Sequence, residues 1–243
     1  MLTAMDRGGV DHAVLLGWYW ENHATCVWHN RFMADCVRRH PDRFTAFASV
    51  QPKAGQAALD ACQEALDSGC RGLGELFPVA QGYAWEDPVF QTLLTWAGEQ
   101  NWPVLLHAQN PLGPRHPGWI DAPLEPYVRL AGEFPQTTFI FAHWGGLLPF
   151  AEINAAIGKQ LANVYYDTAA SPLLYDDRIY RAAINVIGAE RILFGTDYPL
   201  RVYPRSEDVP CWLRRLEAIH NAGLSSAEEA AILGGNASRI LGR

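Results

Sequence analysis

Three polar residues that can take part in metal or acid–base chemistry stand at the ends of apolar runs. His107 follows PVLL, His143 follows FIFA, and Asp197 follows ILFGT. These runs are too apolar for a surface position, so each polar side chain is expected at the end of a buried strand. Imidazole is a good ligand for a divalent metal, and a carboxylate can bind the ion or accept a proton from its water. We therefore predict that the three residues form one site; the alternative is three separate buried polar residues, each compensated on its own.

The elements that would position these residues are seven short apolar runs with helical segments between them. The runs lie at 12–16, 44–50, 71–76, 103–108, 137–143, 163–168 and 191–195. An apolar stripe of helical period spans 56–68 and ends at Gly69, and Asp87-Pro88 has the residue types that begin a helix. Strands buried on both faces that alternate with helices predict a parallel sheet.

Two architectures fit this alternation, an open doubly wound sheet and a closed barrel. We favour the barrel because five chemically active residues fall at the carboxyl ends of different strands, where barrel enzymes keep their chemistry. These residues are Glu75, His107, His143, Asp167 and Asp197. The chain has no glycine-rich phosphate loop, and its 243 residues are close to the length of one eight-stranded barrel. The sequence thus predicts a TIM-like (β/α) barrel in one domain, residues 1–243.

Composition excludes several classes of partner. The hydrophobic fraction of 49% and charged fraction of 19% are typical of a globular protein, and the net charge of −7 argues against a nucleic-acid or anionic-membrane surface. No apolar run approaches a membrane span, and the start MLTAMDRGGVDHAV lacks the apolar region of a signal peptide. Five cysteines without a CxxC pair predict reduced, mostly buried thiols. We expect a cytoplasmic protein that acts on a small molecule.

Seven segments carry a resemblance to a known family. They are MDRGGVDHAVLL (5–16), HPDRFTAFASVQP (40–52), GCRGLGEL (69–76), LLHA, FAHWGG, FGTDYP and GGNASRILG (234–242). In this order they resemble the amidohydrolase superfamily, in particular its amidohydrolase-related branch. That branch includes aminocarboxymuconate-semialdehyde decarboxylase, resorcylate-type decarboxylases and pyrone-dicarboxylate lactonase. FAHWGG and FGTDYP are the most distinctive of the matching segments.

The resemblance implies a role for each of the three polar residues. His107 matches the metal ligand of the family's fifth strand. Asp197 matches the eighth-strand aspartate that touches the metal and acts as general base in the hydrolases. His143 matches a sixth-strand histidine that usually lies beside the metal and polarises or protonates the substrate rather than binding the ion. The resemblance also implies a divalent metal, with zinc the first expectation and manganese the second, and a homodimer.

The sequence departs from the family at its beginning. The family opens with a strand that bears His-x-His, and this chain contains no His-x-His. Its first residues resemble the helix and turn before the family's second strand, so we predict that the first strand is missing. A wrongly chosen start, a true truncation and replacement by another segment are the three explanations. Because His107 and Asp197 alone hold zinc poorly, Glu75 is a candidate third ligand; it is equally able to orient a neighbour.

Candidate substrate-binding residues follow three of the expected strands: Trp18, Trp20 and His23, then Arg115, then Tyr198 and Arg201. Trp18, Tyr19 and Trp20 can wall a flat pocket, or they can pack beneath a loop. Arginines beside the mouth can clamp a substrate carboxylate, and Arg205 offers the same chemistry, whereas surface arginines need no such role. His116 lies beside Arg115 on a long, proline-rich loop in a lid position.

The leading expectation is a metal-dependent hydrolase that cleaves a lactone, amide or similar bond in a small carboxylated or aromatic molecule. Metal-bound water would attack the carbonyl, Asp197 would accept its proton, and His143 would stabilise the oxyanion. The alternative enzyme is a non-oxidative decarboxylase in which His143 or Asp197 delivers a proton to the ring carbon. A metal-free lactonase and a catalytically silent relative remain as further alternatives.

Overall fold

The computed structural model describes residues 1–115, 119–201, 210 and 212–243. Each of the seven apolar runs contains a strand, which confirms the predicted α/β alternation. The strands are β1 (Ala13–Leu15), β2 (Phe44–Ala46), β3 (Leu73–Leu76), β4 (Val104–Leu106), β5 (Phe139–Phe141), β6 (Val164–Asp167) and β7 (Ile192–Leu193). They are shorter than the runs because only part of each run pairs as a regular strand with a neighbour.

All described strand pairs are parallel and follow the order of the chain. β1 pairs with β2, and β3 to β7 form a second sheet in sequential order. A bridge between Ala48 and Leu73 joins the two sheets. Among the described residues, β1 and β7 are not paired with each other, so the parallel ladder is not closed between them.

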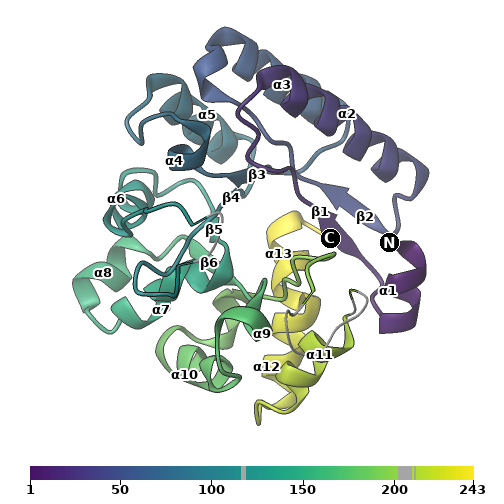
Figure 1. Cartoon of the computed structure of the whole chain (residues 1–243), viewed down its shortest axis with the longest axis vertical. Coiled ribbons are helices and arrows are strands. Elements are labelled where there is room, and N and C mark those ends of the chain that lie inside the picture. Colours follow the sequence, from purple (N-terminus) through teal and green to yellow (C-terminus); the bar gives the residue numbers. More distant parts are fainter. Residues whose placement is uncertain (116–118, 202–209, 211) are drawn as a thin grey trace.

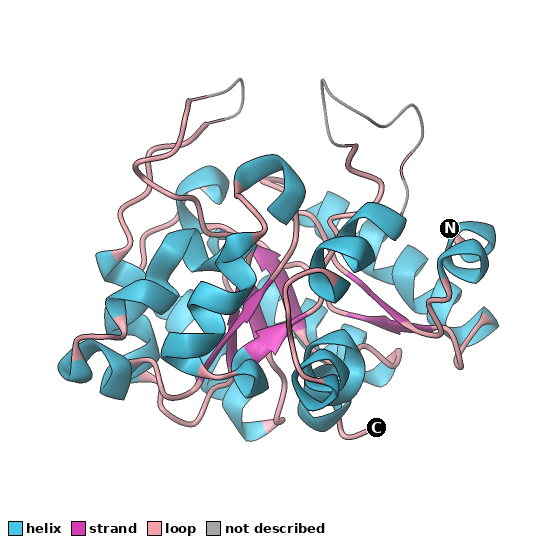
Figure 2. Ribbon diagram, turned by 90° about the horizontal axis from the view of Figure 1, so that it is seen from below, coloured by secondary structure: helices cyan, strands magenta, loops and turns pink. Residues whose placement is uncertain are grey.

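Helices surround the strands (Figures 1 and 2). They are α1 (Leu2–Gly8), α2 (His23–Arg39), α3 (Gln56–Asp67), α4 (Pro78–Gln81), α5 (Pro88–Glu99), α6 (Glu125–Glu133), α7 (Leu148–Ala151), α8 (Ala155–Gln160), α9 (Ser171–Leu174), α10 (Arg178–Ile187), α11 (Leu213–His220), α12 (Ser226–Ala230) and α13 (Asn236–Leu241). The Asp87 carboxylate caps α5 by accepting the N–H groups of Val89 and Phe90, as the sequence predicts. Within the described part of the chain, no helix combines the length and apolar character needed to cross a membrane.

Both faces of β2, β4 and β5 are buried, and the side chains of β4 alternate between two clusters. Val104 and Leu106 of β4 point into the main core beneath the helices, whereas Leu105 joins an inner cluster with Ile140 and Leu193. Val14 of β1 packs against the same inner cluster, and the helix α13 reaches it through Ala237, Ile240 and Leu241. The C-terminal helix therefore covers part of the interior between β1 and β7.

The cysteines agree with the prediction as far as they are described. Cys26, Cys62 and Cys70 are buried free thiols and Cys36 is partly buried. Cys211 lies outside the described residues.

Candidate active site

Glu75 reaches the interior through an irregularity in β3. Leu73 and Leu76 both point into the main core although they are three residues apart. Strict alternation would place Glu75 on the same face as Leu73. The register shift between Leu73 and Leu76 turns the chain instead, as β-bulges do beside active sites. This shift directs the carboxylate toward His107 on the neighbouring strand.

His107 follows β4 on the inner face, two residues after Leu105. Its Nδ1 lies 2.8 Å from Glu75 Oε1, and Gln109 Nε2 lies 3.2 Å from its Nε2. The Tyr127 hydroxyl donates a hydrogen bond to the His107 backbone carbonyl. Both the ring and the backbone of His107 are thus held by neighbouring groups.

His143 begins a tight left-handed turn directly after β5. The φ angles of residues 143–147 are all positive, from 54° to 81°. The His143 backbone N–H and the Ala169 N–H both donate to Asp167 Oδ1 at 2.9 Å, and the His143 ring donates from Nδ1 to the Ala169 carbonyl at 3.1 Å. These contacts leave His143 Nε2 facing Glu75 Oε1 at 3.9 Å. Asp167 therefore caps the turn that follows β6 through the Ala169 N–H and also positions His143.

Glu75, His107 and His143 form the candidate metal centre. One ligand atom from each lies within 4.8 Å of the others. Their side chains are only 13%, 12% and 11% exposed, so a small ion can reach them while bulk water is largely excluded. Two imidazoles and one carboxylate are the donor set of three-ligand catalytic metal sites. The residues present therefore fit a divalent metal.

Burial dominates the electrostatics of this site. It raises the pKa of Glu75 to about 7; the His143 charge opposes this shift and the Asp197 charge adds to it. Burial likewise raises the pKa of Asp167 to about 6 against the opposing effects of the His143 charge and of two backbone hydrogen bonds. Burial also raises the pKa of Tyr19 to about 12, with contributions from the charges of Glu75 and Asp197. The carboxyl groups of Glu75, Asp167 and Asp197 thus line one cavity, which favours a cation there.

Asp197 lies apart from this cluster in the described structure. Its side chain is exposed and its φ is 58°. It lines a cavity of about 1690 Å³ whose walls also include Glu75, His143 and Asp167. The cavity continues between β1 and β7 as far as α13. The structure thus brings His143, rather than Asp197, next to Glu75 and His107, and a metal-ligating role for Asp197 stays a prediction.

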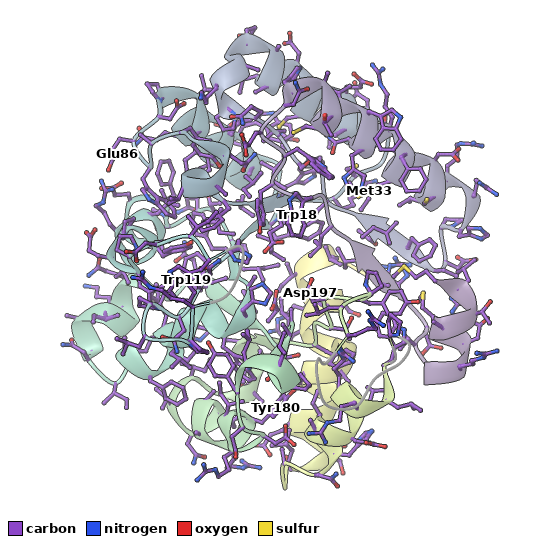
Figure 3. The ribbon with its side chains drawn as sticks, in the orientation of Figure 1. Trp18, Met33, Glu86, Trp119, Tyr180 and Asp197 are labelled. Carbon is purple, nitrogen blue, oxygen red and sulfur yellow. The ribbon has the colours of Figure 1, made fainter. Side chains whose placement is uncertain are left out.

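The predicted substrate-binding residues divide into two groups. Trp18, Trp20 and Tyr198 line the same cavity, and Figure 3 places Trp18 and Asp197 near the centre of the molecule. The described lining does not include the other three: His23 lies in the first turn of α2, and Arg115 and Arg201 are exposed in the segments after β4 and β7. His116 and Arg205 lie outside the described residues.

Sequence reasoning missed three glutamines that organise the site. Gln109 contacts the His107 ring, and the buried Gln51 and Gln81 bind the backbone around the segment that carries Trp18. Only the position of Gln109, two residues after a candidate ligand on the same strand end, offered a signal. Gln51 and Gln81 stand in no pattern that distinguishes them from surface glutamines.

The family profile described as amidohydrolase matches residues 3–243, nearly the whole chain. This protein belongs to the amidohydrolase family. Membership confirms the resemblance found in the sequence and indicates an enzyme of this superfamily. Family membership alone does not specify the metal or the type of reaction.

Individual relatives are distant. A 2-amino-3-carboxymuconate-6-semialdehyde decarboxylase from Dictyostelium discoideum is 22% identical over 88% of this chain. The chain spans only 65% of the length of that relative. A TIM-barrel protein from Bordetella bronchiseptica is 24% identical, with a TM-score of 0.74 over 100% of this chain and 81% of its own. This likeness establishes the barrel-type fold.

A third similar structure contains a metal. It is a dihydroxybenzoic acid decarboxylase from Polaromonas sp. JS666 with bound manganese and the inhibitor 2-nitroresorcinol. It is 21% identical, with a TM-score of 0.71 over 99% of this chain and 84% of its own. Further similar structures are also named decarboxylases.

Proposed function

We propose that this protein is a metal-dependent, non-oxidative decarboxylase of a small aromatic or conjugated carboxylic acid. The observation that carries the proposal is the Glu75–His107–His143 cluster in a chain of the amidohydrolase family. Two of its members, Glu75 and His143, line one cavity with Asp197. The relatives named above support this reaction more strongly than hydrolysis, the leading expectation from the sequence. Hydrolysis becomes the outcome that the experiment must exclude.

Glu75, His107 and His143 would hold the divalent cation, either manganese or zinc. When bound, the cation supplies a positive charge that attracts an acid substrate and helps to stabilise charge that develops during the reaction. Without a cation, the carboxylates of the cavity would repel such a substrate. We infer manganese as readily as zinc, because the carboxylate and imidazole ligands suit both.

The chain's own residues can complete the chemistry. When the bond between the ring carbon and the carboxylate breaks, carbon dioxide leaves and the electron pair stays on the ring carbon. That carbon must then take a proton, which the carboxyl group of Asp197 can deliver, because the Nε2 of His143 would be bound to the cation. The hydrogen bond from His143 Nδ1 to the Ala169 carbonyl fixes the ring so that Nε2 faces the site. Solvent returns the proton to the donor after release of the product.

The test uses protein prepared without chelators and loaded with Mn²⁺ or Zn²⁺. It is incubated with 2,6-dihydroxybenzoate, other hydroxybenzoates and a set of lactones, and carbon dioxide and products are quantified. We expect one carbon dioxide for each acid consumed and, in D₂O, one deuterium at the carbon that lost the carboxylate. Lactone cleavage with no carbon dioxide from any acid would replace the proposal with hydrolysis. No turnover of either class by metal-loaded protein would favour a silent relative.

A further inference from the structure

Residues 17–21 form a loop after β1 that carries Trp18 and Tyr19, and we refer to this loop as the arch. Hydrogen bonds hold it at both ends. At the first end, the Gly17 N–H donates to the Gly74 carbonyl at 2.9 Å. The Glu75 N–H donates in turn to the Gly17 carbonyl at 2.8 Å. The arch is therefore joined directly to the β3 backbone that carries a candidate metal ligand.

Two buried amides hold the second end of the arch. Gln81 Nε2 donates to the carbonyls of Trp20 at 3.1 Å and Val50 at 2.8 Å, and Gln51 Nε2 donates to the Glu21 carbonyl at 2.9 Å. Gln81 and Gln51 are 2% and 3% exposed. Because both amides are buried, water cannot readily take their place as donors, and loss of Gln81 would remove a donor from the buried Val50 carbonyl.

Gln81 is the central member of this arrangement. Its Oε1 accepts the Phe77 N–H at 3.0 Å, and its backbone carbonyl accepts a hydrogen bond from Gln51 Nε2 at 3.2 Å. Together with its bonds to Trp20 and Val50, these contacts connect the segments that follow β1, β2 and β3. One side chain thus sets the position of the arch relative to the two neighbouring strand ends.

The arch carries a stacked pair of rings, of which Trp18 lines the cavity. The Tyr19 ring lies 5.3 Å from the His107 ring and 5.5 Å from the Phe77 ring. Trp18 stacks on Tyr19 with ring centroids 4.4 Å apart and an interplanar angle of 27°. Trp18 is 48% exposed and lines the cavity together with Glu75. The indole therefore offers an accessible aromatic surface beside the candidate metal centre.

We propose that the Trp18–Tyr19 stack selects flat substrates and that Gln81 is the positioning residue that holds this stack beside the metal centre. A flat ring can lie against an indole with its whole face, whereas a puckered ring of equal size makes fewer close contacts and lacks ring stacking. The inference rests on the proposed function only in taking the substrate to be a carboxylic acid. It assigns selection to the arch and leaves proton transfer to other residues.

The test compares the binding of benzoate and cyclohexanecarboxylate, which have equal charge and the same number of carbon atoms. Dissociation constants of metal-loaded protein are measured by titration calorimetry. Ring stacking predicts that the wild type prefers benzoate by about 2- to 10-fold. Trp18→Leu and Gln81→Met should each bring the ratio close to one. Gln63→Met, the same change at an exposed glutamine of α3, should leave the preference intact.

Trp18→Leu keeps the inference testable if Gln81→Met fails to fold, because Trp18 is half exposed and its side chain makes no part of the glutamine contacts. Equal binding of both acids by the wild type, binding of neither, or an unchanged ratio in Trp18→Leu would overturn the inference. An unchanged ratio in folded Gln81→Met would remove the positioning role. Carbon dioxide release is measured separately. If the variants lose the preference for benzoate but the wild type releases no carbon dioxide from any acid, the proposed reaction is contradicted and the role of the arch in selection still holds.

Discussion

Among single residues, substitution of Asp197 tests proton transfer separately from metal binding. Its side chain is exposed in the cavity and lies outside the Glu75–His107–His143 cluster. An amide of the same shape cannot deliver a proton, so Asp197→Asn is expected to lower kcat by about 10²- to 10⁴-fold. Metal content and thermal stability should stay near those of the wild type. A kcat within a few-fold of the wild type would assign the proton to a donor other than Asp197, and loss of metal would make Asp197 a ligand.

The raised pKa of Glu75 predicts how the stability of the metal-free protein depends on pH. Burial raises its pKa from 4.5 to about 7, so the folded state holds a proton that the unfolded state has released. The free energy of unfolding should therefore fall as the pH rises from about 4.5 to about 7, by at most about 3 kcal/mol from this group. In urea denaturation with a chelator present, the free energy of unfolding of Glu75→Gln should decrease less over this pH range than that of the wild type.

The control for this measurement is Glu86→Gln. A hydrogen bond from Arg129 lowers the pKa of Glu86, so this exposed carboxylate cannot produce a fall over the same range. Asp167 has a raised pKa and contributes in the same direction as Glu75 in every variant. An identical pH dependence in wild type and Glu75→Gln would show that Glu75 is ionised in the folded metal-free protein.

At the scale of elements, the left-handed turn after β5 decides where His143 points. A Cβ at Gly146 (φ 63°) would lie 2.5 Å from the Gln109 carbonyl oxygen, a backbone atom that cannot move away cheaply. Gly9 has a similar φ of 65°, but nothing lies within 4 Å of its Cβ position. Gly9→Ala should therefore cost about 1 kcal/mol, from backbone strain alone, and Gly146→Ala about 3 kcal/mol or more.

Urea denaturation of both variants measures these costs, and carbon dioxide release reports the effect on the site. Because the Gly146 clash involves Gln109, which also contacts the His107 ring, activity should fall more in Gly146→Ala than in Gly9→Ala. Equal destabilisation of the two variants would mean that the turn shifts to accommodate the methyl group. Both variants share the cost of a positive φ, so the difference between their free energies of unfolding measures the steric clash at Gly146.

The elements also show what a sequence can and cannot predict. The seven apolar runs predicted the strands because burial on both faces leaves a local signature, and His107 and His143 were predicted as strand-end residues for the same reason. The partnership of Glu75 with both histidines depends on the register shift in β3, and the role of Gln81 depends on carbonyls 31 and 61 residues away in the chain. Contacts of this kind come from tertiary packing, and no local pattern encodes them.

For the whole molecule, the unclosed ladder predicts unequal stability around the barrel. Within the described part of the chain, β1 pairs on one side only and its residues are partly buried, whereas β5 lies between two strands and is fully buried. The edge beyond β7 is partly covered, since the Phe194 N–H donates to the Ile232 carbonyl and α13 packs against β7. Amides of 12–16 should therefore exchange with deuterium on the order of tenfold or more faster than those of 138–142, with 191–195 between them. Mass spectrometry of peptic fragments measures the three segments in one experiment, and equal protection of β1 and β5 would mean that the outer edge of β1 is covered in solution.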